Sequence, residues 1–193
     1  MPSDRAAAAH GRPIFMRHWL RHPIGMGALL PSSPRVADVL ARQMQLDRDG
    51  PILELGAGTG TITGGLIAGG CPAERLVLVE SEPQLVAHLR EHYPETRTIG
   101  GDARQIDALL DGAGIGTLAT VISTLPIKWF PLDDQRAVVM PCLRRLGPGG
   151  HFIQITNAPT PPIDARRLRI NAARVDAVWL HFLPVQVWRF WLD

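Results

Sequence analysis

The chain has 193 residues, of which 46% are hydrophobic, and this size and composition predict one globular domain with a substantial core. Its two cysteines, Cys71 and Cys142, lie far apart and outside any metal-ligand spacing, so we expect neither a disulfide framework nor a metal site, and a reducing cytoplasm is the expected compartment. The net charge of +2 is uneven, because residues 1–35 carry +4 and the remainder carries −2.

The N-terminal part is basic rather than apolar. Arginines interrupt it, and no uninterrupted apolar run reaches about 18 residues, so we expect neither a signal peptide nor a membrane span. Residues 12–22 predict a short amphipathic helix, with an aromatic stripe beside a stripe of arginines. Such helices lie in the headgroup region of anionic membranes; the alternative is a helix that packs its apolar stripe on its own domain. The predicted membrane-binding residues are Arg12, Phe15, Met16, Arg17, Trp19, Leu20 and Arg21.

The rest of the chain alternates predicted strands and helices, which favours a mostly parallel sheet. The strands are expected at 51–55, 75–80, 96–99, 117–123, 151–156, 175–179 and 187–191. The helices are expected at 34–44, after the glycines that follow residue 55, from 81 to about 92, around 106–110, and at 133–145. Two details follow from local chemistry: Ser81 and Gln84 predict a capping box for the third of these helices, and Pro141 predicts a break in the last one.

The turn after the first strand predicts a cofactor site. It reads Glu-Leu-Gly-Ala-Gly-Thr-Gly at 54–60, and such a glycine turn brings backbone close to a nucleotide-like ligand. A carboxylate at Glu54, at the mouth of the strand, would repel a pyrophosphate, Thr61 replaces the small residue of the dinucleotide fingerprint, and the P-loop ending is absent. A ligand with adenosine, an ammonium and a sulfonium, but no phosphate, fits better. That ligand is S-adenosylmethionine.

Two further acids follow the next two strands. Glu80 ends the second strand, twenty residues after Gly60, at the distance where an acid meets ribose hydroxyls. Asp102 follows the third strand in a Gly-Asp-Ala loop and is placed to accept a hydrogen bond from an adenine amino group. The fourth strand ends at Ser123, and its tip is expected to face the same crevice, because ligands bind beyond the carboxyl ends of such strands.

These motifs together resemble the class I S-adenosylmethionine-dependent methyltransferases. The likeness is more specific to the bacterial phospholipid N-methyltransferases, which convert phosphatidylethanolamine stepwise to phosphatidylcholine, and it covers nearly the whole chain. It rests on 15–19, 26–28, 31–33, 101–103, 123–126 and 187–188 in addition to the glycine turn. The resemblance implies a Rossmann-like class I methyltransferase fold, a seven-stranded mostly parallel sheet with helices on both faces. It also implies a division into an N-terminal lid segment with the first core helix, residues 1–45, and a cofactor-binding core, residues 46–193.

Carried over by position, the resemblance implies the following site. The cofactor-binding residues are Met26, Glu54, Gly56, Ala57, Gly58, Gly60, Thr61, Glu80, Ser81, Gly101, Asp102, Ala103, Ser123 and Thr124. The residues implied at the methyl-transfer centre are Ser123, Leu125 and Pro126. The chain departs from the family in having Asn157-Ala158-Pro159 where a Tyr-Gly-Pro element is usual, which removes a tyrosine from the expected headgroup site.

The resemblance further implies S-adenosyl-L-methionine as cofactor, S-adenosyl-L-homocysteine as product and no metal. Phosphatidylethanolamine and anionic phospholipids are the expected partners of a monomer held peripherally at the inner face of the plasma membrane. The spacing of the residues selects no general base. Two alternatives remain open, an rRNA adenine N6-dimethyltransferase and a small-amine methyltransferase; the low net charge and the missing recognition domain argue against nucleic acid.

Overall fold

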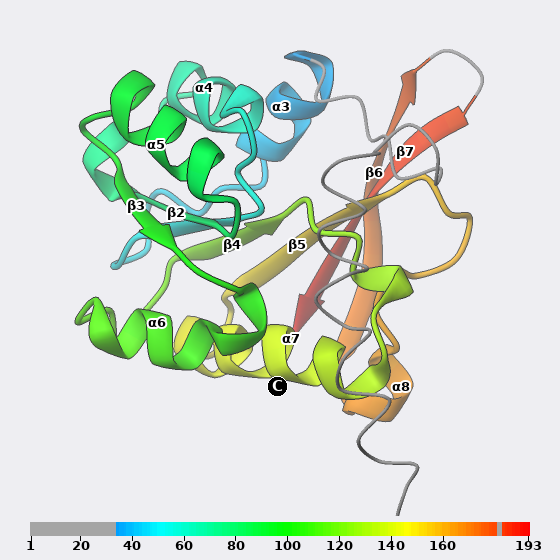
Figure 1. Ribbon diagram of the computed structural model, residues 1–193. Helices are drawn as coiled ribbons and strands as arrows, with labels where there is room; N and C mark the ends of the chain where they lie inside the picture. Colours follow the sequence, from blue (N-terminus) through cyan, green and yellow to red (C-terminus); the bar gives the residue numbers. More distant parts are fainter. Residues whose placement is uncertain (1–33, 181–182) are drawn as a thin grey trace, which may run out of the picture. The chain divides into compact units, whose positions relative to one another are not determined.

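A computed structural model describes residues 34–180 and 183–193, and their core is one seven-stranded sheet (Figure 1). The strand order is β3-β2-β1-β4-β5-β7-β6. The first five strands run parallel, whereas β7 is antiparallel to both β5 and β6. The strands are β1 (Ile52–Leu55), β2 (Leu76–Glu80), β3 (Arg97–Gly100), β4 (Thr120–Ser123), β5 (His151–Thr156), β6 (Asn171–Leu180) and β7 (Leu183–Trp191).

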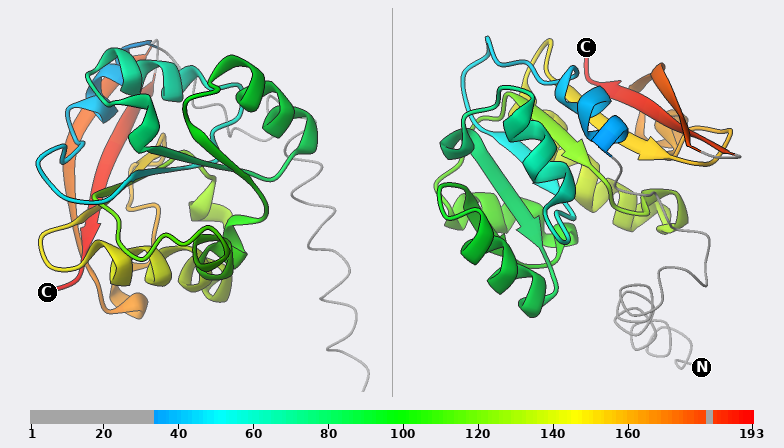
Figure 2. Two further views of the ribbon diagram at one scale, coloured as in Figure 1. Left: turned by 90° about the vertical axis from the view of Figure 1, so that its left-hand side faces the viewer. Right: turned by 90° about the horizontal axis from the view of Figure 1, so that it is seen from above.

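Helices cover both faces of this sheet (Figure 2). One face carries α3 (Pro34–Ala41), α4 (Thr61–Ala68) and α5 (Pro83–His92), and the other carries α6 (Ile106–Gly112) and α7 (Leu132–Leu146). The short elements are η2 (Ala73–Arg75), η3 (Ala103–Gln105), η4 (Ile127–Trp129) and α8 (Ala165–Leu168). The central strands β1, β2 and β4 are buried throughout, as expected for strands covered on both faces. The predicted fold class is confirmed.

Two local predictions are wrong. Ser81 and Gln84 form no capping box: α5 begins at Pro83 with Glu82 as its N-cap and has no side-chain cap, because the amides of Ser81 and Glu82 already donate to the carboxylate of Glu80. Pro141 does not break α7, which continues through it to Leu146. A proline removes one backbone donor, but the buried apolar face of α7 on both sides of Pro141 holds the helix against the sheet.

Strands β6 and β7 are longer than the sequence predicts. The expected strands 175–179 and 187–191 extend to ten and nine residues, and they pair with each other along their length apart from a bulge between Arg174 and Asp176. Leu183 and Pro184 therefore lie inside β7 rather than in a turn. The antiparallel pairing overrides the weak local signal, because each strand supplies the other's backbone hydrogen bonds.

Close packing of α3 on α4 fixes the helix that follows the glycine turn. Val36 and Leu40 of α3 are fully buried. A Cβ atom placed on Gly65 or on Gly69 would overlap the Cβ of Ala37 or of Ala41, respectively. The two glycines, four residues apart, therefore form a flat stripe on which α3 lies.

Replacement of Gly65 by alanine should destabilise the fold. Alanine favours a helix over glycine by about 1 kcal/mol, but the added Cβ overlaps Ala37, and overpacking costs about 1 to 3 kcal/mol. The matched control is Gly112→Ala at the end of α6, where no atom lies within 4 Å of the added Cβ. Urea denaturation should show a lower free energy of unfolding for Gly65→Ala and an equal or higher one for Gly112→Ala; the reverse order would contradict this account of the contact.

Candidate functional site

The glycine turn after β1 lies in the crevice at the carboxyl edge of the sheet. Gly56, Gly58 and Gly60 all have positive φ angles, of 77°, 58° and 80°, a region in which side chains are strained. At Gly56 a side chain would also approach the strand-four tip, with its Cβ 2.8 Å from Leu125 Cδ2. The backbone of this loop is thus held close to the residues that follow β4.

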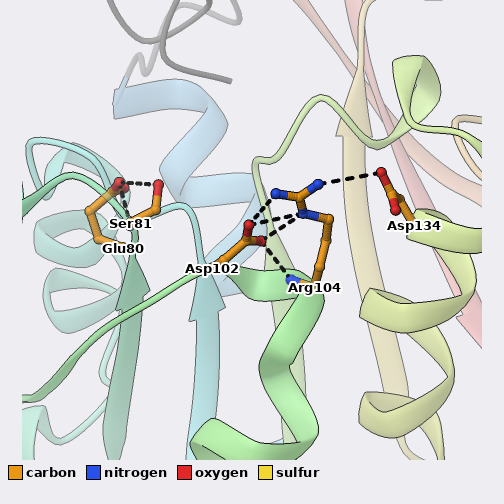
Figure 3. Close-up of polar contacts among 5 residues, drawn as sticks. All are labelled: Glu80, Ser81, Asp102, Arg104 and Asp134. Atoms are coloured by element: carbon orange, nitrogen blue, oxygen red, sulfur yellow. Dashed lines mark hydrogen bonds and ion pairs between the residues drawn. The ribbon is translucent and has the colours of Figure 1, made fainter. Parts of the chain in front are cut away.

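Glu80 ties this turn to the end of β2, and Figure 3 shows its contact with the neighbouring Ser81. Its Oε2 accepts a hydrogen bond from the Gly58 amide at 3.0 Å, and its Oε1 accepts from the amides of Ser81 at 2.7 Å and Glu82 at 3.0 Å. The residue is only 4% exposed. Because a carboxylate oxygen has two lone pairs, Oε2 keeps one acceptor position beyond its bond to Gly58, which is compatible with the predicted contact to a ribose hydroxyl.

Tyr93, the one tyrosine of the chain, supports the last glycine of the turn. Its hydroxyl donates a hydrogen bond to the carbonyl oxygen of Gly60 at 2.8 Å, and its ring occupies the space where a Gly60 side chain would lie. Tyr93 is not among the site residues predicted from the sequence. Its position just after α5 assigns it a structural role, which the turn itself does not reveal.

Glu54 is the penultimate residue of β1, at the mouth of the strand as predicted, and its side chain points into the protein interior. It is fully buried, and one carboxyl oxygen, Oε2, accepts a hydrogen bond from the Thr63 hydroxyl at 2.7 Å. The other, Oε1, is buried with no hydrogen-bond partner among the described residues. Burial raises the pKa of Glu54 to about 8, against the lowering effect of Thr63. An acid with an unpartnered buried oxygen beside the glycine turn fits the ammonium of an amino-acid moiety such as that of S-adenosylmethionine.

The carboxylate of Asp102 is bound by Arg104, a residue of the same loop (Figure 3). It caps η3 through the amide of Arg104 at 2.9 Å and forms an ion pair with the guanidinium of the same residue, which also lies 3.6 Å from Asp134. Burial alone would raise the pKa of Asp102, but the hydrogen bonds and charge of Arg104 outweigh it and lower that pKa. Both oxygens are thus engaged, so a contact of Asp102 with adenine requires Arg104 to share it. Sequence reasoning missed Arg104, although its place two residues after the acid was a usable signal.

The tip of β4 lies against the glycine turn. The Thr124 hydroxyl donates to the Gly56 carbonyl at 2.8 Å, and the Gln154 amide Nε2 donates to the Leu125 carbonyl at 2.8 Å. Ser123 is fully buried and accepts from the Leu125 amide at 3.4 Å, whereas Leu125 and Pro126 are half-buried. Gln154, which the sequence did not single out, lies beside Ser123 in register and holds this tip in place.

The remaining predicted site residues divide into two groups. Four lie in the crevice loops or at the start of the elements that follow them: Ala57, Thr61, Gly101 and Ala103. The Gly101 amide donates to the Glu80 carbonyl at 2.9 Å, which brings the third loop next to the second. The other group lies outside the described residues, and comprises Arg12, Phe15, Met16, Arg17, Trp19, Leu20, Arg21 and Met26.

Comparison with known proteins identifies the family. The family model described as "Methyltransferase domain" matches residues 52–150, half of the chain, from β1 to the residue before β5. A curated relative, the ornithine lipid N-methyltransferase of Singulisphaera acidiphila, is 31% identical over 149 residues, which cover 76% of this chain and 78% of the relative. The chain belongs to the class I S-adenosylmethionine-dependent methyltransferases.

Two further proteins are similar to this methyltransferase. The ribosomal RNA small subunit methyltransferase A of Myxococcus xanthus is 32% identical over 133 residues, 66% of this chain but 46% of that protein. A solved structure, the 1,6-didemethyltoxoflavin-N1-methyltransferase of Burkholderia thailandensis with bound S-adenosylhomocysteine, superposes with a TM-score of 0.67 at 15% identity, covering 100% of this chain and 92% of that one. The latter shows the shared fold.

Residues 34–180 and 183–193 of the methyltransferase contain neither a candidate membrane span nor a candidate metal cluster. No helix there combines the length and the apolar character that a membrane crossing requires. That part of the chain also gathers no group of three or more His, Cys, Asp or Glu side chains able to hold a metal ion.

Replacement of Tyr93 by phenylalanine should weaken cofactor binding. The ring stays, but the Gly60 carbonyl loses a hydrogen bond, for which about 1 kcal/mol, or about a fivefold rise in the Kd for S-adenosylmethionine, is expected. Titration calorimetry measures this directly. The matched control is Thr96→Val, which removes a hydroxyl bond of the same length, 2.8 Å, to the Tyr93 carbonyl and leaves the turn alone; equal effects of both changes would contradict the role of Tyr93 at the turn.

The raised pKa of Glu54 predicts a pH-dependent stability. Between the ordinary pKa of 4.5 and about 8, the folded protein keeps this proton and the unfolded chain has lost it, so the free energy of unfolding should fall as the pH rises through that window. Urea denaturation at pH 5.5 and pH 8 should show a loss of about 1 to 3 kcal/mol. Glu54→Gln should flatten this slope, whereas the exposed control Glu91→Gln should not; an unchanged slope in Glu54→Gln would assign the effect elsewhere.

Proposed function

We propose that this methyltransferase transfers methyl groups to the amine of phosphatidylethanolamine, and to its mono- and dimethyl derivatives, towards phosphatidylcholine. The observation that carries the proposal is the match to an ornithine lipid N-methyltransferase, which extends over 76% of this chain and 78% of that relative. The reaction type, N-methylation, and the lipid class of the substrate both derive from that likeness. The choice of headgroup derives from the sequence resemblance to phospholipid N-methyltransferases.

The chemistry needs little from side chains. S-adenosylmethionine, when bound, supplies the methyl of its sulfonium, to which a deprotonated amine nitrogen forms a new N–C bond while the S–C bond breaks and S-adenosylhomocysteine leaves. The role of the protein is then alignment and exclusion of water. Gly56 and Gly58 bring backbone to the cofactor, Oε1 of Glu54 is the acceptor available for its ammonium, and the tip at Leu125 and Pro126 borders the path of the amine.

Membrane attachment is part of the proposal. A bilayer lipid does not leave the membrane readily, so the enzyme docks on it, and basic residues near an anionic surface contribute about 1 kcal/mol each. The arginines of segment 12–22 supply this attraction. The expected location is the inner face of the plasma membrane, with the enzyme as a peripheral monomer.

Methylation of rRNA is the second candidate, because rRNA methyltransferases are also among the relatives. The match to the Myxococcus xanthus protein covers 46% of that protein, against 78% for the ornithine lipid N-methyltransferase. Residues 36–193 carry a net charge of −2, which opposes binding to a polyanion. The more extensive match and the charge favour the lipid.

Liposomes of phosphatidylethanolamine should accept labelled methyl from S-adenosylmethionine. We expect label in the mono-, di- and trimethylated lipids, separated by chromatography, and more of it when an anionic lipid is present. Gly60→Ala, which strains the turn and overlaps the Tyr93 ring, should abolish transfer. No labelled lipid from a protein that binds S-adenosylmethionine would refute the lipid substrate, and label in structured RNA would establish the second candidate.

A further inference from the structure

An open groove of about 430 Å³ lies between α3 and β6, outside the methyl-transfer site. Four of its eight lining residues are charged: Arg35, Asp38 and Arg42 come from α3 and the residue just after it, and Asp176 comes from β6. Trp179, also from β6, completes the wall. The volume falls in the range of sites for small ligands.

Three of the four charged side chains of the groove have no side-chain partner in the described part of the chain, and the fourth, Asp176, accepts a hydrogen bond from the Ala177 amide at 2.7 Å. Arg35 and Arg42 are exposed and seven residues apart, so they lie near the same side of the helix, with Asp38 between them. Within the described part of the chain, neither arginine forms an ion pair or a side-chain hydrogen bond, and the same holds for Asp38. Two cations and two carboxylates cancel, so the groove matches a zwitterion better than an anion.

Trp179 adds an aromatic face. Trp179 is 69% exposed, which is a large exposure for tryptophan. Among the described residues, the other exposed large hydrophobic side chains are Leu46 and Trp129. Tryptophan is the preferred ring for binding ammonium groups by cation–π attraction, and it is enriched where proteins meet the headgroups of a membrane. Guanidinium groups bind phosphate oxygens in paired hydrogen bonds. The groove thus offers one partner for each part of a phosphoalkylammonium group.

The Trp179 end of the groove lies at the same edge of the sheet as the glycine turn. β6 is antiparallel to β7, and β7 is antiparallel to β5, so β6 runs in the same direction as the parallel strands. Trp179, one residue before the end of β6, therefore lies toward the edge at which the parallel strands have their carboxyl ends. A bilayer that contacts Trp179 also faces the crevice.

We propose that this groove binds the zwitterionic headgroup of a phospholipid in the bilayer, with its phosphate at Arg35 and Arg42 and its ammonium at Trp179 and the two carboxylates. The identity of the ligand rests on the proposed function, but the site is separate from the one where methyl transfer occurs. It holds a lipid without reacting with it and fixes the orientation of the enzyme on the membrane.

Vesicles of phosphatidylcholine test this site without methyl transfer, because their headgroup is uncharged overall and has no N–H to replace. Sedimentation of the full chain with these vesicles gives the affinity. The double variant Arg35→Gln with Arg42→Gln, and separately Trp179→Ala, should bind about tenfold more weakly, and Trp179→Phe should recover most of the loss. The matched control, Arg97→Gln with Arg166→Gln, changes the charge equally on exposed residues of β3 and α8 and should bind as the wild type does.

The outcomes separate the two proposals. Circular dichroism and S-adenosylmethionine binding first establish that each variant is folded. Equal vesicle affinities of the wild type, groove variants and control, or no binding by the wild type, would overturn the headgroup site. If micromolar glycerophosphocholine displaces the protein from the vesicles, the groove binds the free headgroup compound, and the proposal that its ligand is a lipid in the bilayer is wrong. Methyl transfer to phosphatidylethanolamine in detergent micelles, measured in parallel, tests the proposed function alone. If the wild type transfers no methyl group there, the proposed function is refuted and the result for vesicle binding is unaffected.

Discussion

The carboxylate of Glu80 is the interaction on which the crevice depends. At the end of β2 it accepts from the glycine turn after β1 and from two amides of its own turn, and its backbone carbonyl accepts from Gly101 in the loop after β3. One residue therefore joins three successive loops. Parallel strands bring their carboxyl ends to one edge but do not position the loops there, and Glu80 supplies that position for three of them.

The same edge is connected further across the sheet. Thr124, just after β4, donates to the carbonyl of Gly56 in the glycine turn. Gln154 on β5 donates to the carbonyl of Leu125 at the tip of β4. A continuous series of side-chain to backbone contacts thus runs from β2 through β1 and β4 to β5. Each contact reaches the backbone rather than another side chain. These contacts fix the shape of the loops at this edge of the sheet.

The sequence predicted the elements well and their polar contacts poorly. Glycines with positive φ and the alternation of apolar runs are local properties, so the turn and the sheet could be read directly. The capping box at Ser81 failed because the Ser81 amide, which the Gln84 side chain would have to bind, donates to the carboxylate of Glu80 instead. The break at Pro141 failed because burial on the sheet outweighed the missing donor. Competition of this kind between groups is decided by tertiary distances, which spacing along the chain does not contain.

The two acids beside the glycine turn have different roles because they have different numbers of donors. Three backbone amides donate to Glu80, whereas only the hydroxyl of Thr63 donates to Glu54, whose second oxygen is buried without a partner. Burial with so few donors favours the neutral acid, which is why the pKa of Glu54 rises to about 8. An ammonium brought next to that oxygen reverses the balance, since a nearby cation favours the ionised form. If the ammonium of the cofactor lies against that oxygen, its binding at neutral pH is coupled to release of a proton from Glu54, and the attraction between the two charges has to exceed the cost of that release.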